Sequence, residues 1–142
     1  MTVNPFGMVM IADGGTPRTI TGYAREAISG GQFVGGSTAL GAVGSDASGY
    51  QASDILVVDA AEDNFIGIAL NDAVSGAPIT VAMKGLFIVP VDNDGERIEA
   101  GNIVNQLGNS RVSVSGNTYE NPIGRALTAG STGDYVVLSL GV

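Results

Sequence analysis

Carboxylates are the residues of this chain best suited to acid–base chemistry, and the sequence does not show any two of them converging. The sequence contains no histidine and no cysteine, so Ser-His-Asp triads, Cys-His pairs and metal centres built on either residue are impossible. A glycosidase-like pair of carboxylates stays formally open, although the Asp and Glu residues are scattered over predicted turns. We therefore expect no enzyme activity, no catalytic residue, no cofactor and no bound metal.

One acidic stretch, DNDGE at 92–96, begins like a calcium-binding loop. It lacks the spaced ladder of Asp and Asn ligands and the Glu at the twelfth position that such loops use. We favour a hairpin turn, because Asp-Gly is a strong turn signal, and a cation site at Asp92, Asn93 and Asp94 is the alternative. The glycine-rich stretch at 29–36 lacks the Lys-Ser/Thr pair and the following helix of a phosphate-binding loop.

The charge of the chain excludes several classes of partner. It carries 14 acidic and 6 basic residues among 142, a net charge of −8, and only 14% of its residues are charged, against ~25% in ordinary domains. Such an acidic field disfavours nucleic acid and anionic membranes as partners, and no apolar run approaches the ~18 residues that cross a bilayer. So little charge also indicates that copies of the chain, or a partner, cover part of its surface.

The composition is typical of short strands joined by tight turns. Glycine contributes 22 residues, and amphipathic helical patterns are scarce. Apolar and polar residues alternate from residue 78, and Gly85 predicts a bulge or bend before the next strand. Other strands or alternating runs are expected at the following ranges: 32–34, 54–60, 64–70, 86–91, 110–116, 121–127 and 135–142.

Two phrases occur twice, which predicts that the chain is built from two similar halves. NFIGIAL at 64–70 and NPIGRAL at 121–127 share five of seven residues, and ISGGQFV at 28–34 matches IEAGNIV at 98–104 in pattern. The glycine inside each Ile-Gly-x-Ala-Leu phrase lets another backbone approach closely, and the glycine of each turn supplies positive φ. Because a two- or three-stranded piece is marginal alone, the halves should pack on each other.

We therefore predict a mainly β fold, a small antiparallel β-barrel or sandwich with two pseudo-repeated halves and an extended N-terminal arm. The arm covers residues 1–22 and the β domain residues 23–142, with half-repeats at roughly 23–92 and 93–142. The arm carries apolar side chains and is punctuated by Pro and Gly. It either reaches onto a neighbouring subunit or partner, or forms an ordinary first strand of the core.

The order of these elements resembles that of the capsid cement, or head decoration, proteins of tailed bacterial and archaeal viruses. The resemblance covers roughly residues 23–142 and depends on seven elements in order. Two of the elements are turns, at Ala27–Val34 and Ala100–Val104. The first turn is followed by Gly67–Leu70, Ser75–Met83 and Gly85-Leu86-Phe87, and the second turn by Gly124–Leu127 and Val136–Leu140. The 37–53 loop is long for this pattern.

The resemblance implies a structural virion protein, made in the host cytoplasm, that binds the outer surface of an assembled capsid as a homotrimer. It would bridge subunits of the major capsid protein and so stabilise the shell. On this basis we expect two sets of contact residues. The candidates for capsid contact are Phe6, Met8, Met10, Ile11 and Arg18. The candidates for self-association are Phe33, Phe65 and Phe87, although for all three a place in the core is the favoured interpretation.

Two other functions stay open at this point. A carbohydrate- or host-surface-binding β module would normally display exposed aromatic platforms, and this chain has four Tyr and no Trp. Another virion component, such as a tail or spike subunit, would share the low charge and the β structure.

Overall fold

The computed structural model describes residues 10–12, 18–37, 55–60, 64–92, 97–107, 110–114 and 122–141. The strands are β1 (Met10–Ala12), β2 (Thr19–Ala24), β3 (Phe33–Gly36), β4 (Leu56–Asp59), β5 (Phe65–Ala69), β6 (Pro78–Ala82), β7 (Gly85–Pro90), β8 (Ile103–Leu107), β9 (Arg111–Ser113), β10 (Pro122–Ala126) and β11 (Tyr135–Leu140). The described ranges contain no helix, and hence none long and apolar enough to cross a membrane. The prediction of a mainly β fold is confirmed.

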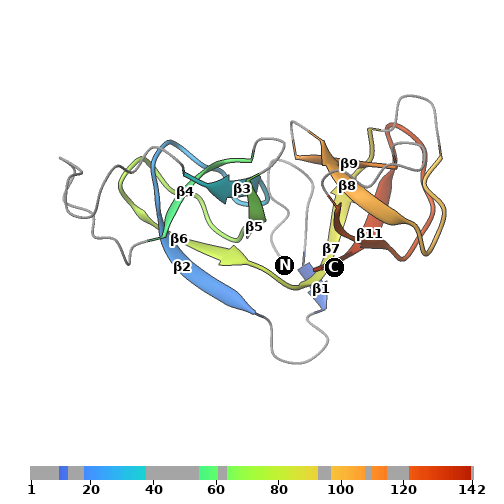
Figure 1. The fold of residues 1–142 in the computed structure, drawn as a ribbon, viewed down its shortest axis with the longest axis horizontal. Helices are drawn as coiled ribbons and strands as arrows, with labels where there is room; N and C mark the ends of the chain where they lie inside the picture. The colour runs from blue at the N-terminus through green and yellow to red at the C-terminus, as the bar shows by residue number, and fades with distance from the viewer. Residues whose placement is uncertain are drawn as a thin grey trace.

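Strands β2 to β6 close into a five-stranded barrel, which forms the first half of the molecule (Figure 1). The strands follow one another around the barrel in the order β2-β4-β3-β5-β6, and β2 and β4 form a parallel pair. Along β6, Ile79 and Val81 point into the barrel and are buried, whereas Pro78 is exposed and Thr80 half-buried on the outside. This is the alternation that the sequence predicts for a strand with one buried face.

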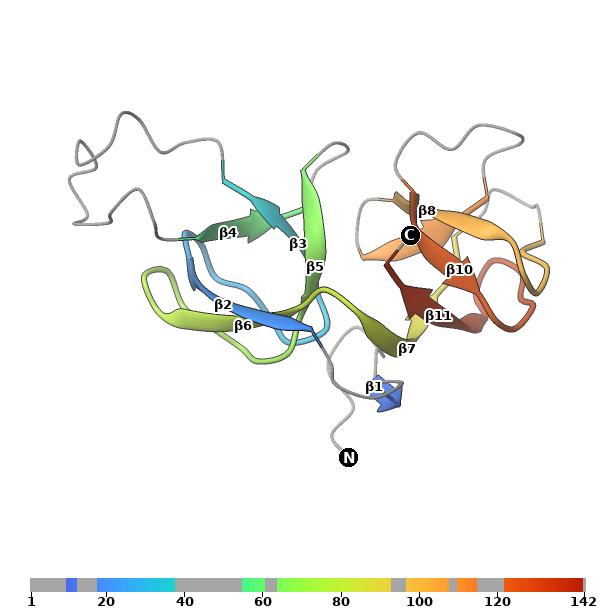
Figure 2. The ribbon, with the colours of Figure 1, turned by 60° about the horizontal axis from the view of Figure 1, so that its bottom comes forward.

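Strands β7 to β11 form the second half, and β1 from the start of the chain pairs with the edge of β7 (Figure 1, Figure 2). The six strands are ordered β1-β7-β11-β10-β8-β9, and all neighbours are antiparallel. The sheet almost closes, because β7 and β9 meet at one parallel bridge between Val91 and Val112. The equivalent strands of the first half, β2 and β4, form a regular ladder, so only the first half is a closed barrel.

The two halves repeat the same pairing scheme, which confirms the duplication seen in the sequence. Strands β2 to β6 correspond in order to β7 to β11, and each antiparallel pair of the barrel has its counterpart in the sheet. Bridges outside the strands are repeated as well. Ile28 pairs with Ala73 in the first half, and Ile98 pairs with Gly130 in the second.

The repeated turn before β3 and β8 explains why its sequence pattern contains a glycine and an amide. Gly31 and Gly101 have φ of 89° and 93°, a conformation that costs a residue with a Cβ about 1–2 kcal/mol. The side-chain oxygens of Gln32 and Asn102 accept hydrogen bonds from the backbone N–H groups three residues earlier, at 3.1 and 2.8 Å. The turn therefore closes in the same way in both halves.

The glycine of each Ile-Gly-x-Ala-Leu strand lies where a neighbouring backbone leaves no room for a side chain. A Cβ on Gly67 would collide with the carbonyl oxygen of Ala82, and one on Gly124 would collide with that of Ser139. The close backbone approach predicted from the sequence is therefore present in both halves.

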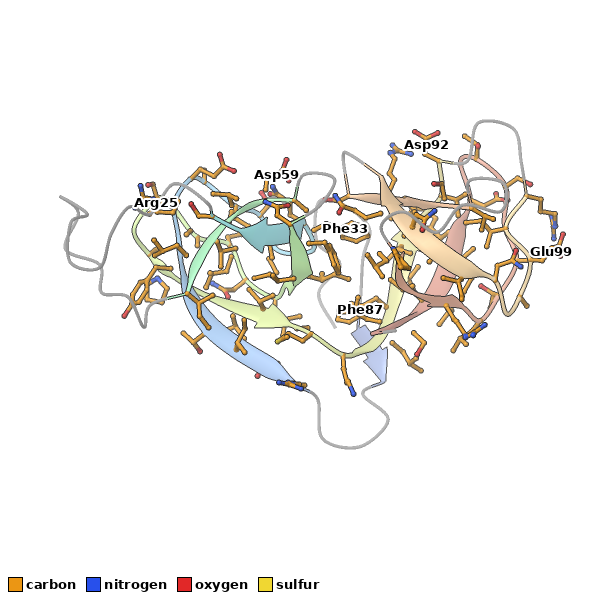
Figure 3. All side chains as sticks on the ribbon, viewed as in Figure 1. Arg25, Phe33, Asp59, Phe87, Asp92 and Glu99 are labelled. Carbon is orange, nitrogen blue, oxygen red and sulfur yellow. The ribbon has the colours of Figure 1, made fainter. Side chains whose placement is uncertain are left out.

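One hydrophobic core joins the two halves, and a smaller one fills the barrel. Phe33, Ile68 and Ala82 lie on the outside of the barrel and cluster with Phe87 and the rest of the second half's core. Figure 3 shows Phe33 and Phe87 in the region between the halves. The core inside the barrel consists of Ala24, Ile28, Val34, Val57, Ala69, Ala73, Ile79 and Val81. Because the larger core is continuous, the two halves form one body.

The strand bounds differ in detail from the predicted division of the chain. β2 already includes residues 19–22, and the equivalent strand of the second half, β7, begins at Gly85. The division into an arm over 1–22 and half-repeats at 23–92 and 93–142 stays a prediction, and the strand equivalence favours a boundary near 83–84.

Candidate functional site

Several of the described carboxylates accept hydrogen bonds that join neighbouring segments of the barrel. The Glu26 Oε1 atom accepts from the Asp59 N–H at 2.7 Å, and Asp59 Oδ1 accepts from Gln32 Nε2 at 2.7 Å. Asp72 Oδ1 accepts from the Gly30 N–H at 2.7 Å. No group of three or more Asp and Glu residues in the described ranges could hold a metal ion. Of the acidic stretch at 92–96, only Asp92 lies among the described residues, and it is half-buried.

A buried polar contact locks the two halves together. The Phe33 N–H donates to Ser110 Oγ at 2.9 Å, and Gln106 Nε2 donates to the Ala60 carbonyl at 3.3 Å. Ser110 is 3% exposed and has a positive φ of 59°, which is unusual for a residue other than glycine. Phe33 also packs edge-on against the Phe65 ring, with centroids 5.5 Å apart. The Phe33–Phe65 contact lies within the first half, whereas the two hydrogen bonds join the first half to the second.

An apolar surface supported by regular strands lies on the outward side of the second half. Register partners in antiparallel strands project to the same side of a sheet, so Ile88, Val137 and their neighbours share one face. We call this set the outer face. It consists of Leu86, Ile88 and Pro90 of β7, Tyr135, Val137 and Ser139 of β11, Arg125 of β10, Leu127 just after β10, and Ile103 of β8.

The outer face is apolar, partly exposed and free of acidic residues. Leu127 and Tyr135 are 47% and 53% exposed, and Ile88 and Val137 are half-buried on the surface of the sheet. Strands β7 to β11, within their stated bounds, contain no carboxylate, and their charged residues are Arg111 and Arg125. In a chain of net charge −8, an apolar face that carries arginine is suited to contact with another protein.

The structure describes three of the five residues proposed for capsid contact. Phe6 and Met8 lie outside the described residues. Met10 and Ile11 belong to β1, which pairs with β7 of the same chain. Arg18 is exposed, just before β2, and its carbonyl accepts a hydrogen bond from the Met83 N–H.

The three phenylalanines proposed for self-association are brought together by the core between the halves. Phe33 and Phe87 are each 1% exposed, and Phe65 is half-buried against the same cluster. These positions agree with the core interpretation that the sequence favoured, and a role of the three residues in self-association stays a prediction.

Sequence reasoning missed the outer face, although a signal for it was present. In the strands over 85–90 and 135–140 the alternate positions are apolar on both sides, as in GLFIVP and YVVLSL. A strand that is apolar on both sides is typical of one covered on both sides. The second half packs its core on one side of these strands, and the other side carries the outer face.

Comparison with solved structures gives a similar fold in a phage protein. The head fiber gp8.5 N base of bacteriophage phi29 matches with a TM-score of 0.55 and 17% sequence identity, over 89% of this chain and 95% of that chain. At this identity the likeness shows the fold alone. No curated protein matches the sequence.

Comparison with protein families gives a match over most of the sequence. The model of a family described as phage cement protein matches residues 11–140. This family is structural and non-enzymatic, in agreement with the expectation from the residues. Because the match spans nearly the whole β structure described above, the chain belongs to the phage cement protein family, a family of virion capsid components.

Proposed function

We propose that this protein binds the outer surface of an assembled capsid as a homotrimer and stabilises the shell by bridging major capsid subunits. The observation that carries this proposal is the family match over residues 11–140. The fold supports it, since the base of a phage head fiber has a similar one. The protein would be made in the host cytoplasm and act on the outside of the virion.

The single body formed by the two halves suits a bridging role. A bridge between two capsid subunits resists their separation only if it does not bend at a hinge. Here the continuous core and the buried bond from Phe33 to Ser110 tie the halves together. Force applied to one half would therefore be carried to the other.

The low charge of the surface suits many weak contacts made at once. Binding only the expanded lattice would stabilise that lattice by mass action, and linked contacts on neighbouring subunits would add through effective concentration. For the shell contact we propose the N-terminal segment, with Phe6, Met8, Met10, Ile11 and Arg18. The exposed position of Arg18 and the edge position of β1 are consistent with this assignment.

The test uses expanded empty heads that lack the protein, with unexpanded heads as the comparison. Purified protein is titrated onto both, and bound copies per head are measured by sedimentation and gel densitometry. We expect saturable, stoichiometric binding to expanded heads and a rise in the temperature at which the heads rupture. Absent or non-saturable binding to expanded heads would contradict the proposal.

A charge reversal tests the N-terminal contact. Arg18→Glu should weaken binding to heads, whereas Arg97→Glu should leave it unchanged. Arg97 is a matched control because it is also exposed, in an ion pair with Glu99 at 3.1 Å, on a different loop. Equal binding by the two variants would exclude Arg18 from the contact.

A further inference from the structure

We infer that a second copy of this chain docks on the outer face of the second half. The inference rests on the proposed function and deepens it by naming the surface through which copies join. It starts from the repeat, because strands β2 to β6 and β7 to β11 place equivalent residues on the outside of both halves. The two halves can therefore be compared position by position.

The first comparison concerns the row of residues that crosses β3, β5 and β6. Phe33, Ile68 and Ala82 are register partners there, and the second half of the same chain buries all three. The equivalent row crosses β8, β10 and β11 of the outer face and consists of Ile103, Arg125 and Ser139. In the first half, this side of the repeat is thus covered by the second half of the same chain, which has the same pairing scheme. In the second half it is at the surface, with Arg125 exposed.

The second comparison concerns the next row, where the halves differ in polarity. Thr21 and Thr80 are register partners on the outside of the barrel, and their equivalents in the second half are Ile88 and Val137. Threonine at these positions is compatible with the fold, so the apolar residues are not needed to form the sheet. Their presence only in the second half indicates that this side of the second half is covered in the assembled protein.

A second copy fits this face in charge and in geometry. Arg125 is the one charged residue of the outer face. A second copy carries 14 acidic and 6 basic residues, so its net charge is opposite in sign to that of Arg125. A contact between copies that repeats the way the two halves of one chain pack together joins two different surfaces of the chain. Such head-to-tail contacts produce closed rings when the rotation closes, which is the arrangement a trimer needs.

The matching surface on the second copy follows from the same equivalence. The Arg25 N–H donates to the Val57 carbonyl in the first half, and the Asp92 N–H donates to the Val112 carbonyl in the second, so Val57 and Val112 are equivalent. Ile55 and Ser110 each lie two residues earlier, so Ile55 is the first-half equivalent of Ser110. Ser110 is the residue of the second half that bonds to Phe33 on the covered face. Ile55, the residue just before β4, is 39% exposed, so it presents an apolar side chain at the position equivalent to that of Ser110.

The test is the mass of the full-length chain in solution, measured by sedimentation equilibrium over a wide concentration range. The variant carries Ile88→Thr and Val137→Thr together, which installs the residues of the barrel at the equivalent positions. We expect its self-association to be weakened by about tenfold or more, as for residues central to an interface. Val74→Thr is the matched control, because Val74 is 72% exposed and lies in a barrel loop outside the face; it should associate like the wild type.

A second variant protects the test against a folding defect. If thermal unfolding shows that the double variant is not folded, Ile55→Thr probes the other side of the same contact without touching the core, and it should weaken association as well. The inference is overturned if the wild type stays monomeric at all concentrations, or if the folded variants associate as tightly as the wild type.

Head binding by the same proteins separates this inference from the proposed function. Loss of association in the variant, with no binding of the wild type to heads, would support the docking face and contradict the cement role. A monomeric wild type whose binding to heads is lost in the double variant would assign the outer face to the capsid. That result would overturn the inference and leave the proposed function in place.

Discussion

Ser110→Ala tests whether the buried hydrogen bond between the halves contributes to the stability of the whole chain. The substitution removes the Oγ acceptor of the Phe33 N–H, a bond of 2.9 Å between buried groups. A buried donor left without a partner costs about 1–3 kcal/mol. The left-handed backbone at Ser110 strains serine and alanine alike, so the strain cancels between the two proteins.

The expected loss can be converted into a shift of the urea midpoint. A domain of this size has an m-value of about 2 kcal/mol per molar urea, so the midpoint should fall by about 0.5–1.5 M. Ser75→Ala is the matched control, since Ser75 Oγ donates to the Arg25 carbonyl at 3.0 Å in an exposed position. Its cost should stay within about 0.5 kcal/mol, or about 0.25 M. Fluorescence of the tyrosines and far-UV circular dichroism should report one shared transition for the wild type, because one core spans both halves.

Two results would refute this reasoning. If Ser110→Ala and Ser75→Ala have the same midpoint, the Phe33 N–H has found another partner and the bond does not hold the halves. If the wild type unfolds in two separate steps, the halves are independent units and their common core contributes little to cooperativity.

The remaining predictions concern the repeated glycines and the common core. Gly67→Ala and Gly124→Ala should each destabilise the chain by several kcal/mol, because a Cβ there meets a backbone carbonyl that cannot move without breaking a strand pair. Gly36→Ala, at which a Cβ meets nothing within 4 Å, should change the thermal midpoint little; equal losses at all three sites would show that the close approach is not the cause. Phe33→Ala should cost about 3–5 kcal/mol in urea unfolding, and it should also raise the exposure of Phe65 to solvent. A loss below about 1 kcal/mol would mean that Phe33 is not part of a close-packed core.

Part of the candidate site could be anticipated from the sequence and part could not. The missing histidine and cysteine already excluded triads and thiolate metal sites, and the order of the repeated elements pointed to a cement protein. The sequence favoured the core for Phe33 and Phe87 but could not establish it, because both residues alternate correctly for a strand whichever side is covered. Their burial depends on the second half lying against the outside of the barrel.

The sequence by itself determined the features that depend on neighbours along the chain. The glycines at 67 and 124, the glycine-amide turns and the period-two strands each follow from steric limits within a few residues, so both copies could be recognised from their letters. The tertiary structure decided which strand faces are covered, that Ser110 would bond across the halves, and that Ile88 and Val137 would lie on the surface. These outcomes depend on the packing of segments far apart in the chain, and local residue preferences carry no information about which distant surface arrives on a given strand.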